Sequence, residues 1–178
     1  AQIKTLGLNH LTWFYGFIVN GKDYWPQIMQ ATISEMLSQD DPYFDPHTLK
    51  VLGMIPNYYL RYYYYTKSML KEQQSWPPSR AEQVMSIEKD LLAYYADESK
   101  TTPPEDLMKR GGAYYSTVAT QLINAHYNNL NEVHIVNVRH NGAVPGWDTA
   151  WVLELPCRVG SDGIIPIPAA PLPLPCES

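Results

Sequence analysis

The chain has 178 residues and a mass of 20.3 kDa; 45% of its residues are hydrophobic and 17% are charged. This is the composition of a globular protein whose core is large enough to fold without disulfide or metal staples. A net charge of −5 with no long basic run argues against a nucleic-acid surface, which needs clustered Lys and Arg. No segment has the roughly 18 consecutive apolar residues of a membrane span, which argues against a membrane protein.

The two cysteines, Cys157 and Cys176, are too few for a disulfide framework, and neither lies in a spacing typical of zinc sites. They indicate a reducing, cytoplasmic setting. Ala1 stands at the edge of a predicted strand without a start signal, and the N-terminus shows no charged-then-apolar leader. We therefore expect the chain to be a fragment of a longer protein.

Residues 3–17, IKTLGLNHLTWFYGF, form an apolar run of high strand propensity that is followed by the turn signal Asn20-Gly21. The run predicts a buried strand. His10 interrupts it, and an imidazole buried among apolar side chains needs partners for both ring nitrogens. The residue alone favours a core histidine bonded to backbone carbonyls and leaves a metal ligand as the alternative.

Helical spacing of apolar residues then predicts a helix from Trp25 to about Gln39. We interpret the acidic loop 40–46 as a solvated turn with helix-capping aspartates, in preference to a metal site. Another helix should begin just after Pro56-Asn57 and carry tyrosines all round its surface. Such a helix cannot face solvent on any side, so we expect it in the middle of the fold. Its tyrosines are Tyr58, Tyr59, Tyr62, Tyr63, Tyr64 and Tyr65.

A tyrosine at the start of this helix has a possible chemical role. A phenol with an ordinary pKa near 10 becomes a usable base when nearby positive charge stabilises the phenolate. Arg61 lies two residues beyond Tyr59 and therefore off its helix face, so it stays a structural or electrostatic candidate.

Ser79 and Glu82 have the spacing of a capping box and predict a helix that extends to about Ala96, with a loop over 97–104 after it. Arg80 lies in the first turn, where the helix dipole disfavours a positive charge, so local stability does not explain it. From the sequence it is either a ligand contact or a solvated surface residue.

The two glycines after Arg110 allow a tight bend before a further helix that should run toward Tyr127. We interpret Arg110 as a charge at the C-terminus of a short preceding helix, with a ligand or interface contact as the alternative.

The remaining chain has the alternating pattern of strands over 133–139 and 151–157, with a turn at Asn141-Gly142 between them. Another turn follows over 161–163, before residues 164–167. We interpret His134 and His140 as strand-surface residues without a catalytic role. The tail that follows is proline-rich and extended.

Several phrases resemble, in the same order, glycoside hydrolase family 4, the NAD- and metal-dependent glycosidases, in the branch that acts on 6-phospho-β-glucosides. The resemblance covers residue 7 to about residue 167. The phrases are GLNH at 7–10, PNYYLRYY at 56–63, RAEQV at 80–84, RGGAYYS at 110–116, NVRHNG at 137–142 and LELPC at 153–157.

The resemblance implies roles for individual residues. In the family the histidine of GLNH ligates a divalent metal, usually manganese, which gives this role to His10. The catalytic tyrosine, which removes the proton from sugar C2, aligns with Tyr59, and Tyr58 is the alternative if the helix register differs. Asn9 and Arg80 would contact the substrate.

The implied fold is α+β, with helices packed on an antiparallel sheet as in the lactate-dehydrogenase-like C-terminal domain of family 4. Residues 1–167 would form this catalytic or substrate domain, and 168–178 the tail. The implied activity is hydrolysis of 6-phospho-β-glucosides by redox-assisted elimination with NAD and Mn²⁺. The family's glycine-rich NAD-binding domain and its metal-binding cysteine lie upstream of GLNH, and this chain contains neither. We therefore expect the fragment alone to be inactive and to need that N-terminal domain.

Two alternatives stay open. One is a glycosidase of the same family with α-linked specificity. The other is a non-catalytic module whose aromatic clusters bind carbohydrate or form a subunit interface. In either case the abundance of aromatic residues and the scarcity of charge predict a homo-oligomer.

Overall fold

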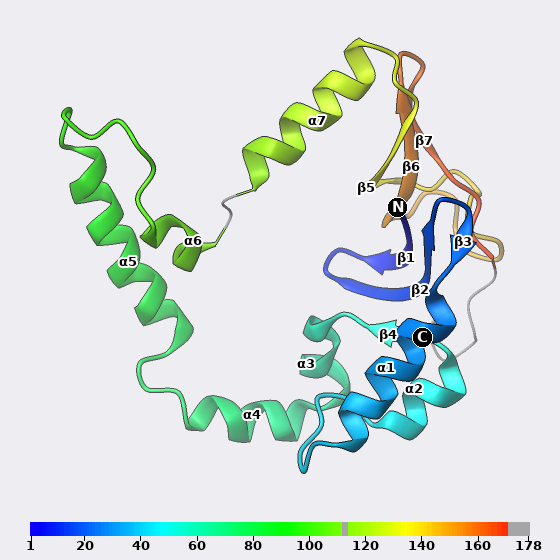
Figure 1. Ribbon diagram of the computed structural model, residues 1–178, viewed down its shortest axis with the longest axis horizontal. Helices are drawn as coiled ribbons and strands as arrows, with labels where there is room; N and C mark the ends of the chain where they lie inside the picture. Colours follow the sequence, from blue (N-terminus) through cyan, green and yellow to red (C-terminus); the bar gives the residue numbers. More distant parts are fainter. Residues whose placement is uncertain (112–113, 171–178) are drawn as a thin grey trace. The chain divides into compact units, whose positions relative to one another are not determined.

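The computed structural model describes residues 1–111 and 114–170 (Figure 1). Predictions that concern Gly112, Ala113, Cys176 and the tail beyond residue 170 lie outside the described residues. An antiparallel sheet and seven helices named α1 to α7 make up the described chain, which confirms the predicted α+β class. The described chain divides into two compact units, a sheet unit of residues 1–65 and 124–170 and a helical unit of residues 66–111 and 114–123.

A β-hairpin opens the sheet unit. Strands β1 (Gln2–Leu8) and β2 (Leu11–Val19) pair antiparallel up to Leu8 and Leu11, so Asn9 and His10 form the turn. The prediction of one continuous buried strand over 3–17 is therefore wrong. The polar Asn-His pair separates two apolar stretches, and reversal there lets both stretches present their inward residues to the same core.

The hairpin is part of a seven-stranded sheet in which every pair is antiparallel. The order is β3 (Lys22–Asp23), β2, β1, β6 (Val152–Gly160) and β5 (Glu132–Arg139), with β4 (Ile55–Pro56) on β2 and β7 (Gly163–Pro166) on β6. The strands predicted over 133–139 and 151–157 are thus confirmed, β6 extends further than predicted, and β7 follows the turn that was predicted over 161–163. One core cluster lies on this sheet and comprises Leu6, Trp13, Met54, Leu60, Val144, Leu153, Leu155 and Cys157.

A second core cluster lies beside the hairpin, where helices α1 (Trp25–Leu37) and α2 (Pro46–Leu52) pack together. It comprises Met29, Met36, Phe44 and Leu49. Asp45 caps α2, because its carboxylate accepts hydrogen bonds from the backbone N–H of Thr48 at 2.8 Å and from its hydroxyl at 2.6 Å. These bonds lower the pKa of Asp45 below its ordinary value. They confirm the interpretation of the acidic loop as a capping turn.

The tyrosine-rich segment is not the single central helix that the sequence predicts. It forms a 3₁₀ turn, η1 (Tyr58–Leu60), then α3 (Arg61–Tyr64), and its helical path breaks at Tyr65 before α4 (Thr66–Gln74). The buried positions of η1 and α3 are taken by Leu60 and Arg61. Five tyrosines are consequently 41–69% exposed, namely Tyr58, Tyr59, Tyr62, Tyr63 and Tyr64.

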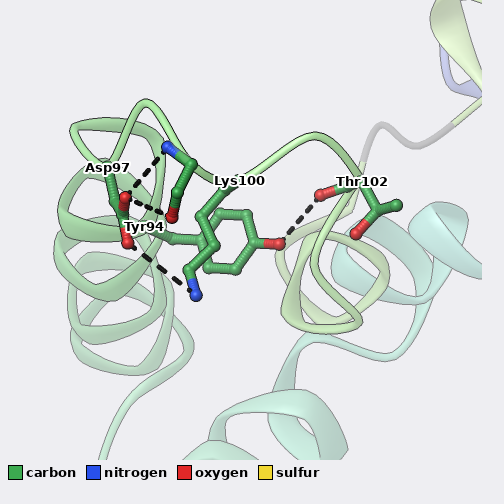
Figure 2. A network of polar contacts seen from close by, with 5 residues as sticks. Tyr94, Asp97, Lys100 and Thr102 are labelled. Atoms are coloured by element: carbon green, nitrogen blue, oxygen red, sulfur yellow. Dashed lines mark hydrogen bonds and ion pairs between the residues drawn. The ribbon is translucent and has the colours of Figure 1, made fainter.

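The helical unit contains α4, α5 (Arg80–Tyr95), α6 (Asp106–Arg110) and the first part of α7 (Tyr115–Tyr127). The predicted capping box is confirmed: the backbone and side chain of Ser79 both bond with Glu82. Figure 2 shows the loop after α5, where the Tyr94 hydroxyl donates to the Thr102 carbonyl at 2.9 Å and Asp97 bonds with Ser99 and Lys100.

The last residues of α7 return to the sheet unit. His126 Nδ1 lies 2.7 Å from the carbonyl oxygen of Gly160, and the Asn129 side chain accepts from Ser161 N–H at 2.9 Å. These contacts fasten the end of α7 to the β6–β7 turn. Among the described helices, none has the length and apolar character needed to cross a membrane.

The histidines near β5 differ from each other. His134 is half-buried and lies 3.2 Å from the Glu132 carboxylate. His140 is only 1% exposed, so its interpretation as a strand-surface residue is wrong. The chain leaves β5 at Arg139, and the loop that follows folds back over the His140 ring.

Candidate active site

The frame of the site is the contact between the β1–β2 hairpin and the segment that leads into η1. Strand β4 pairs with β2 through Trp13–Pro56 and Phe14–Ile55, and the Asn57 N–H donates to the Thr12 carbonyl at 2.8 Å. These bonds fix the start of η1 to the hairpin. Gly7 belongs to the same frame, because a Cβ there would collide with the Leu11 carbonyl oxygen.

Tyr59 stands on a turn that Asn57 caps. The Asn57 side chain accepts from the Tyr59 N–H at 3.1 Å, and its carbonyl accepts from the Leu60 N–H at 2.9 Å. Leu60 is 5% exposed and belongs to the core cluster that also contains Trp13 of the hairpin. The turn therefore buries Leu60 and leaves the neighbouring Tyr59 side chain at the surface.

His10 and Tyr59 meet at this surface. Their rings are stacked, with centroids 5.5 Å apart and planes inclined by 26°. The interpretation of His10 as a core histidine is wrong, because it is an exposed residue of the hairpin turn. Within the described part of the chain, no hydrogen bond engages the His10 ring nitrogens or the Tyr59 hydroxyl. Both groups are thus available to a ligand.

Arg61 makes Tyr58 different from Tyr59, because it binds the Tyr58 hydroxyl. Arg61 is 6% exposed as a residue. Its guanidinium donates from Nη1 to the Tyr58 hydroxyl at 2.8 Å and lies 5.0 Å from the ring centroids of both Tyr43 and Tyr58. Cation–π contacts of this kind hold a buried guanidinium between aromatic rings. Arg61 thus has the structural role that the sequence left open, and the Tyr58 oxygen is already in use.

Tyr43 and Tyr62 complete this aromatic surface, and sequence reasoning missed both. The Tyr43 ring meets Tyr58 edge-on at 5.8 Å, and the Tyr62 ring stacks on Tyr59 at 6.3 Å with an inclination of 24°. Helical spacing places Tyr62 one turn after Tyr59 and could have indicated that pair. Tyr43 comes from the loop before α2, and no local pattern links it to the tyrosine-rich segment.

The other predicted substrate contacts, Asn9 and Arg80, lie in different units. Asn9 is exposed in the hairpin turn next to His10. Arg80 belongs to the helical unit, where its Nη2 donates to the carbonyl oxygen of Lys109 at 2.9 Å at the end of α6. The structure therefore brings Asn9, His10 and Tyr59 together, whereas Arg80 bonds with the end of α6 in the helical unit.

Arg110 lies in the last turn of α6 and pairs with Glu88 of α5 at 3.4 Å. This position fits the interpretation of a charge at a helix C-terminus. Both members of the pair are exposed, so the pair adds little to stability.

A metal would find one suitable ligand here. The exposed His10 imidazole can offer a ring nitrogen, but the described residues contain no group of three or more His, Cys, Asp or Glu side chains that could hold an ion. Cys157 is fully buried in the core, and burial raises the pKa of its thiol to about 11. A thiol that stays protonated is no metal ligand. The described residues therefore fit a divalent metal as part of a coordination shell, with other ligands required from elsewhere.

A large apolar hollow of the sheet unit lies away from this pair. It has a volume of about 600 Å³, and neither His10 nor Tyr59 lines it. Its walls are Trp13, Phe44, His47, Thr48, Leu49, Val51, Leu52, Pro56, Tyr64 and Tyr65. The candidate active site is instead the exposed surface around the His10 and Tyr59 rings.

Comparison with known proteins gives consistent matches over most of the chain. The C-terminal domain of family 4 glycosyl hydrolases matches residues 5–178. The chain is 36% identical to a 6-phospho-beta-glucosidase of Thermotoga maritima, with 89% of this chain and 38% of the relative covered. It is 32% identical to the 6-phospho-beta-glucosidase of Escherichia coli, with 94% and 39% covered.

The fold is similar to a solved structure of the 6-phospho-beta-glucosidase from Thermotoga maritima with manganese, NAD⁺ and glucose-6-phosphate. The TM-score is 0.84 at 33% sequence identity, and the alignment covers 99% of this chain and 41% of that chain. The chain thus spans about two fifths of the length of these relatives.

Proposed function

The chain belongs to family 4 of the glycosyl hydrolases, as their C-terminal domain, and we propose that residues 1–167 form the substrate domain of a 6-phospho-β-glucosidase. The observation that carries this proposal is the stacked His10–Tyr59 pair, 5.5 Å between ring centroids. These two residues come from phrases almost 50 positions apart, and the fold brings them to one surface. The named activity of the relatives supports the substrate class.

In this proposal Tyr59 is the catalytic base and His10 a metal ligand. When bound, the divalent metal and NAD supply the polarisation and the redox step that make the hydrogen at sugar C2 acidic. The Tyr59 phenolate accepts that proton, for which its hydroxyl is exposed and uncommitted among the described residues. A ring nitrogen of His10 holds the metal beside the phenol, where positive charge favours the phenolate.

Asn9 and Arg80 are proposed to bind the substrate. The Asn9 amide lies next to His10 in the hairpin turn and can donate to and accept from sugar hydroxyls. Arg80 has several guanidinium N–H groups, of which Nη2 bonds with the Lys109 carbonyl, so others remain for a substrate oxygen.

The activity is proposed to need the N-terminal NAD-binding domain of the longer protein. One imidazole alone binds a hard divalent ion weakly, because such an ion prefers several fixed ligands. The intact protein is further proposed to self-associate, because large apolar side chains such as Leu92, Tyr115 and Tyr127 are 65–85% exposed in the isolated chain. The reducing, cytoplasmic setting stays a prediction.

The experiment compares the intact protein with residues 1–178 alone. The intact protein with NAD and Mn²⁺ should hydrolyse a chromogenic 6-phospho-β-glucoside, and the His10→Ala variant should lose its response to Mn²⁺. The isolated chain should show no turnover and no tight manganese binding by calorimetry. Turnover by the isolated chain that survives repurification would contradict the proposal.

The same assay distinguishes the two alternatives. Faster hydrolysis of the 6-phospho-α-glucoside would assign α-linked specificity. Binding of a glucoside without NAD or metal, together with absence of turnover by the intact protein, would support a non-catalytic module.

A further inference from the structure

The loop between β5 and β6 is organised around a buried histidine that the proposed chemistry does not use. His140 is 1% exposed and uses both ring nitrogens. Nδ1 accepts from the Val144 N–H at 3.2 Å, and Nε2 lies 2.7 Å from the Asp148 carbonyl oxygen. An N–H group opposite Nδ1 requires that nitrogen to be the acceptor, so the ring is neutral and its proton is on Nε2.

Backbone bonds complete the loop around this ring. The His140 N–H donates to the Trp151 carbonyl at 3.1 Å, and its own carbonyl accepts from the Ala143 N–H at 2.8 Å. The Asp148 carboxylate caps the far end through the Ala150 N–H at 2.9 Å. The imidazole thus joins Val144 and Asp148 inside the loop, whose ends are held by backbone bonds from His140 to Trp151 and from Asn141 to Thr149.

The bridge places Val144 in the core below the candidate active site. Val144 is 2% exposed and shares a core cluster with Leu60, which directly follows Tyr59. The same cluster contains Leu6 and Trp13, which lie on the two strands of the hairpin that carries His10. The residues that support His10 and those that support Tyr59 therefore meet in one cluster. Val144 is the loop's buried member of that cluster, and Ala143 and Trp147 of the same loop pack against it half-buried.

We propose that His140 is a positioning residue for the His10–Tyr59 pair, acting through Val144. The proposal rests on the proposed function for its kinetic consequence. Loss of the ring bonds releases Val144, the cluster relaxes beneath Leu60, and the Tyr59 phenol shifts relative to His10. A displacement of about 1 Å in a catalytic group can lower turnover on the order of 100-fold.

The first test replaces His140 in the intact protein. His140→Leu keeps the volume and removes both ring bonds, whereas His140→Asn keeps one acceptor and one donor. We expect His140→Leu to lower kcat about 10- to 100-fold with KM for NAD within about threefold of wild type, and His140→Asn to recover most of kcat. His134→Leu, on β5 just before this loop, is the control and should stay within about twofold. A folded His140→Leu protein with wild-type kcat would overturn the proposal.

A second pair of variants covers the case in which His140→Leu fails to fold. Val144→Ala and Val159→Ala make the same deletion at sites that are 2% and 1% exposed, and Val159 lies outside the cluster that holds Leu60. Only Val144→Ala should lower kcat, by about 3- to 10-fold, at a comparable loss of melting temperature. Equal kcat for the two variants would overturn the proposal.

Hydrogen exchange separates failure of this proposal from failure of the proposed function. Amide exchange in peptides that cover residues 9–13 and 57–62 should speed up at least threefold in Val144→Ala and stay unchanged in Val159→Ala. This result needs no turnover, so it holds if the intact protein proves inactive on phosphoglucosides. Unchanged amide exchange in Val144→Ala would contradict the positioning role of His140 even if the glucosidase activity is found.

Discussion

The sheet unit and the helical unit are stabilised in different ways. The sheet unit has two core clusters, and residues such as Leu6 and Leu153 are completely buried in it. In the helical unit, among the described residues 66–111 and 114–123, only Met69 and Leu91 are buried. Its helices begin and end at local signals such as the Ser79–Glu82 capping box. Tertiary packing therefore positions the His10–Tyr59 pair, whereas local sequence signals determine where α5, the helix that carries Arg80, begins.

The largest expected effect concerns the chemistry of the sheet unit. In the intact protein Tyr59→Phe should lower kcat by about 100- to 10,000-fold, because a general base contributes about that much, with NAD binding near wild type. Tyr58→Phe is the matched control and should keep most of the activity, since Arg61 occupies the Tyr58 hydroxyl. If Tyr58→Phe is the inactive variant, the base lies one residue earlier.

The next contrast is between leucines of the two units. Leu153→Ala removes a side chain that is 0% exposed and should destabilise the sheet unit by about 2–5 kcal/mol. Leu92→Ala removes one that is 65% exposed on α5 and should cost less than about 0.5 kcal/mol in the isolated chain. Urea unfolding of both variants measures the difference. A similar loss for the two would show that the helical unit has a buried surface in solution.

Alkaline titration tests the burial of Cys157. Burial raises the pKa of this thiol from 9.0 to about 11, so the folded state keeps its proton more tightly than the unfolded state. Its stabilising contribution is complete below pH 9 and is lost as the pH rises to about 11, on the order of 2 kcal/mol in total. Urea unfolding between pH 8 and pH 11 should show this loss in wild type and a smaller one in Cys157→Ala. If the free energy of unfolding depended on pH equally in the two proteins, burial of the Cys157 thiol would not be the cause of the loss.

The last of these effects is local to the helical unit. Ser79→Ala removes the cap of α5 and should cost about 1 kcal/mol. The loss should appear as faster amide exchange in the first turn of α5 with no change in the β1–β2 hairpin. Ser99→Ala, in the loop after α5, is a control that leaves the cap intact. A change in hairpin exchange would show that the two units unfold together.

Local signals in the sequence were sufficient for much of this fold. The caps at Asp45 and Ser79 and the alternating strands β5 and β6 depend on near neighbours, and the structure confirms them. Tertiary contacts decided the features that were missed. The turn at Asn9-His10 forms because both flanking stretches pack on one core, and His140 is buried because the loop that follows it folds back over its ring.

In the candidate site, too, local sequence accounts for some features and tertiary contacts for others. Family phrases singled out His10 and Tyr59, but their stacking depends on the pairing of β4 with β2, which no local pattern indicates. The tyrosines were expected inside the fold because their pattern has no polar face. Leu60 and Arg61 take the buried positions instead, and Arg61 is accommodated between the rings of Tyr43 and Tyr58.

The central claim is that Tyr59 accepts the proton from sugar C2 beside a metal held by His10. Hydrolysis of a 6-phospho-β-glucoside by the intact protein in D₂O tests it most directly, because a base at C2 exchanges that hydrogen with solvent. Mass spectrometry of the released sugar phosphate should show one deuterium at C2 with wild type and with Tyr58→Phe. In the same incubation time, Tyr59→Phe should give at most about 1% of the wild-type product and of the exchange in recovered substrate. Release of product without deuterium at C2 by wild type, or undiminished exchange in Tyr59→Phe, would contradict the account.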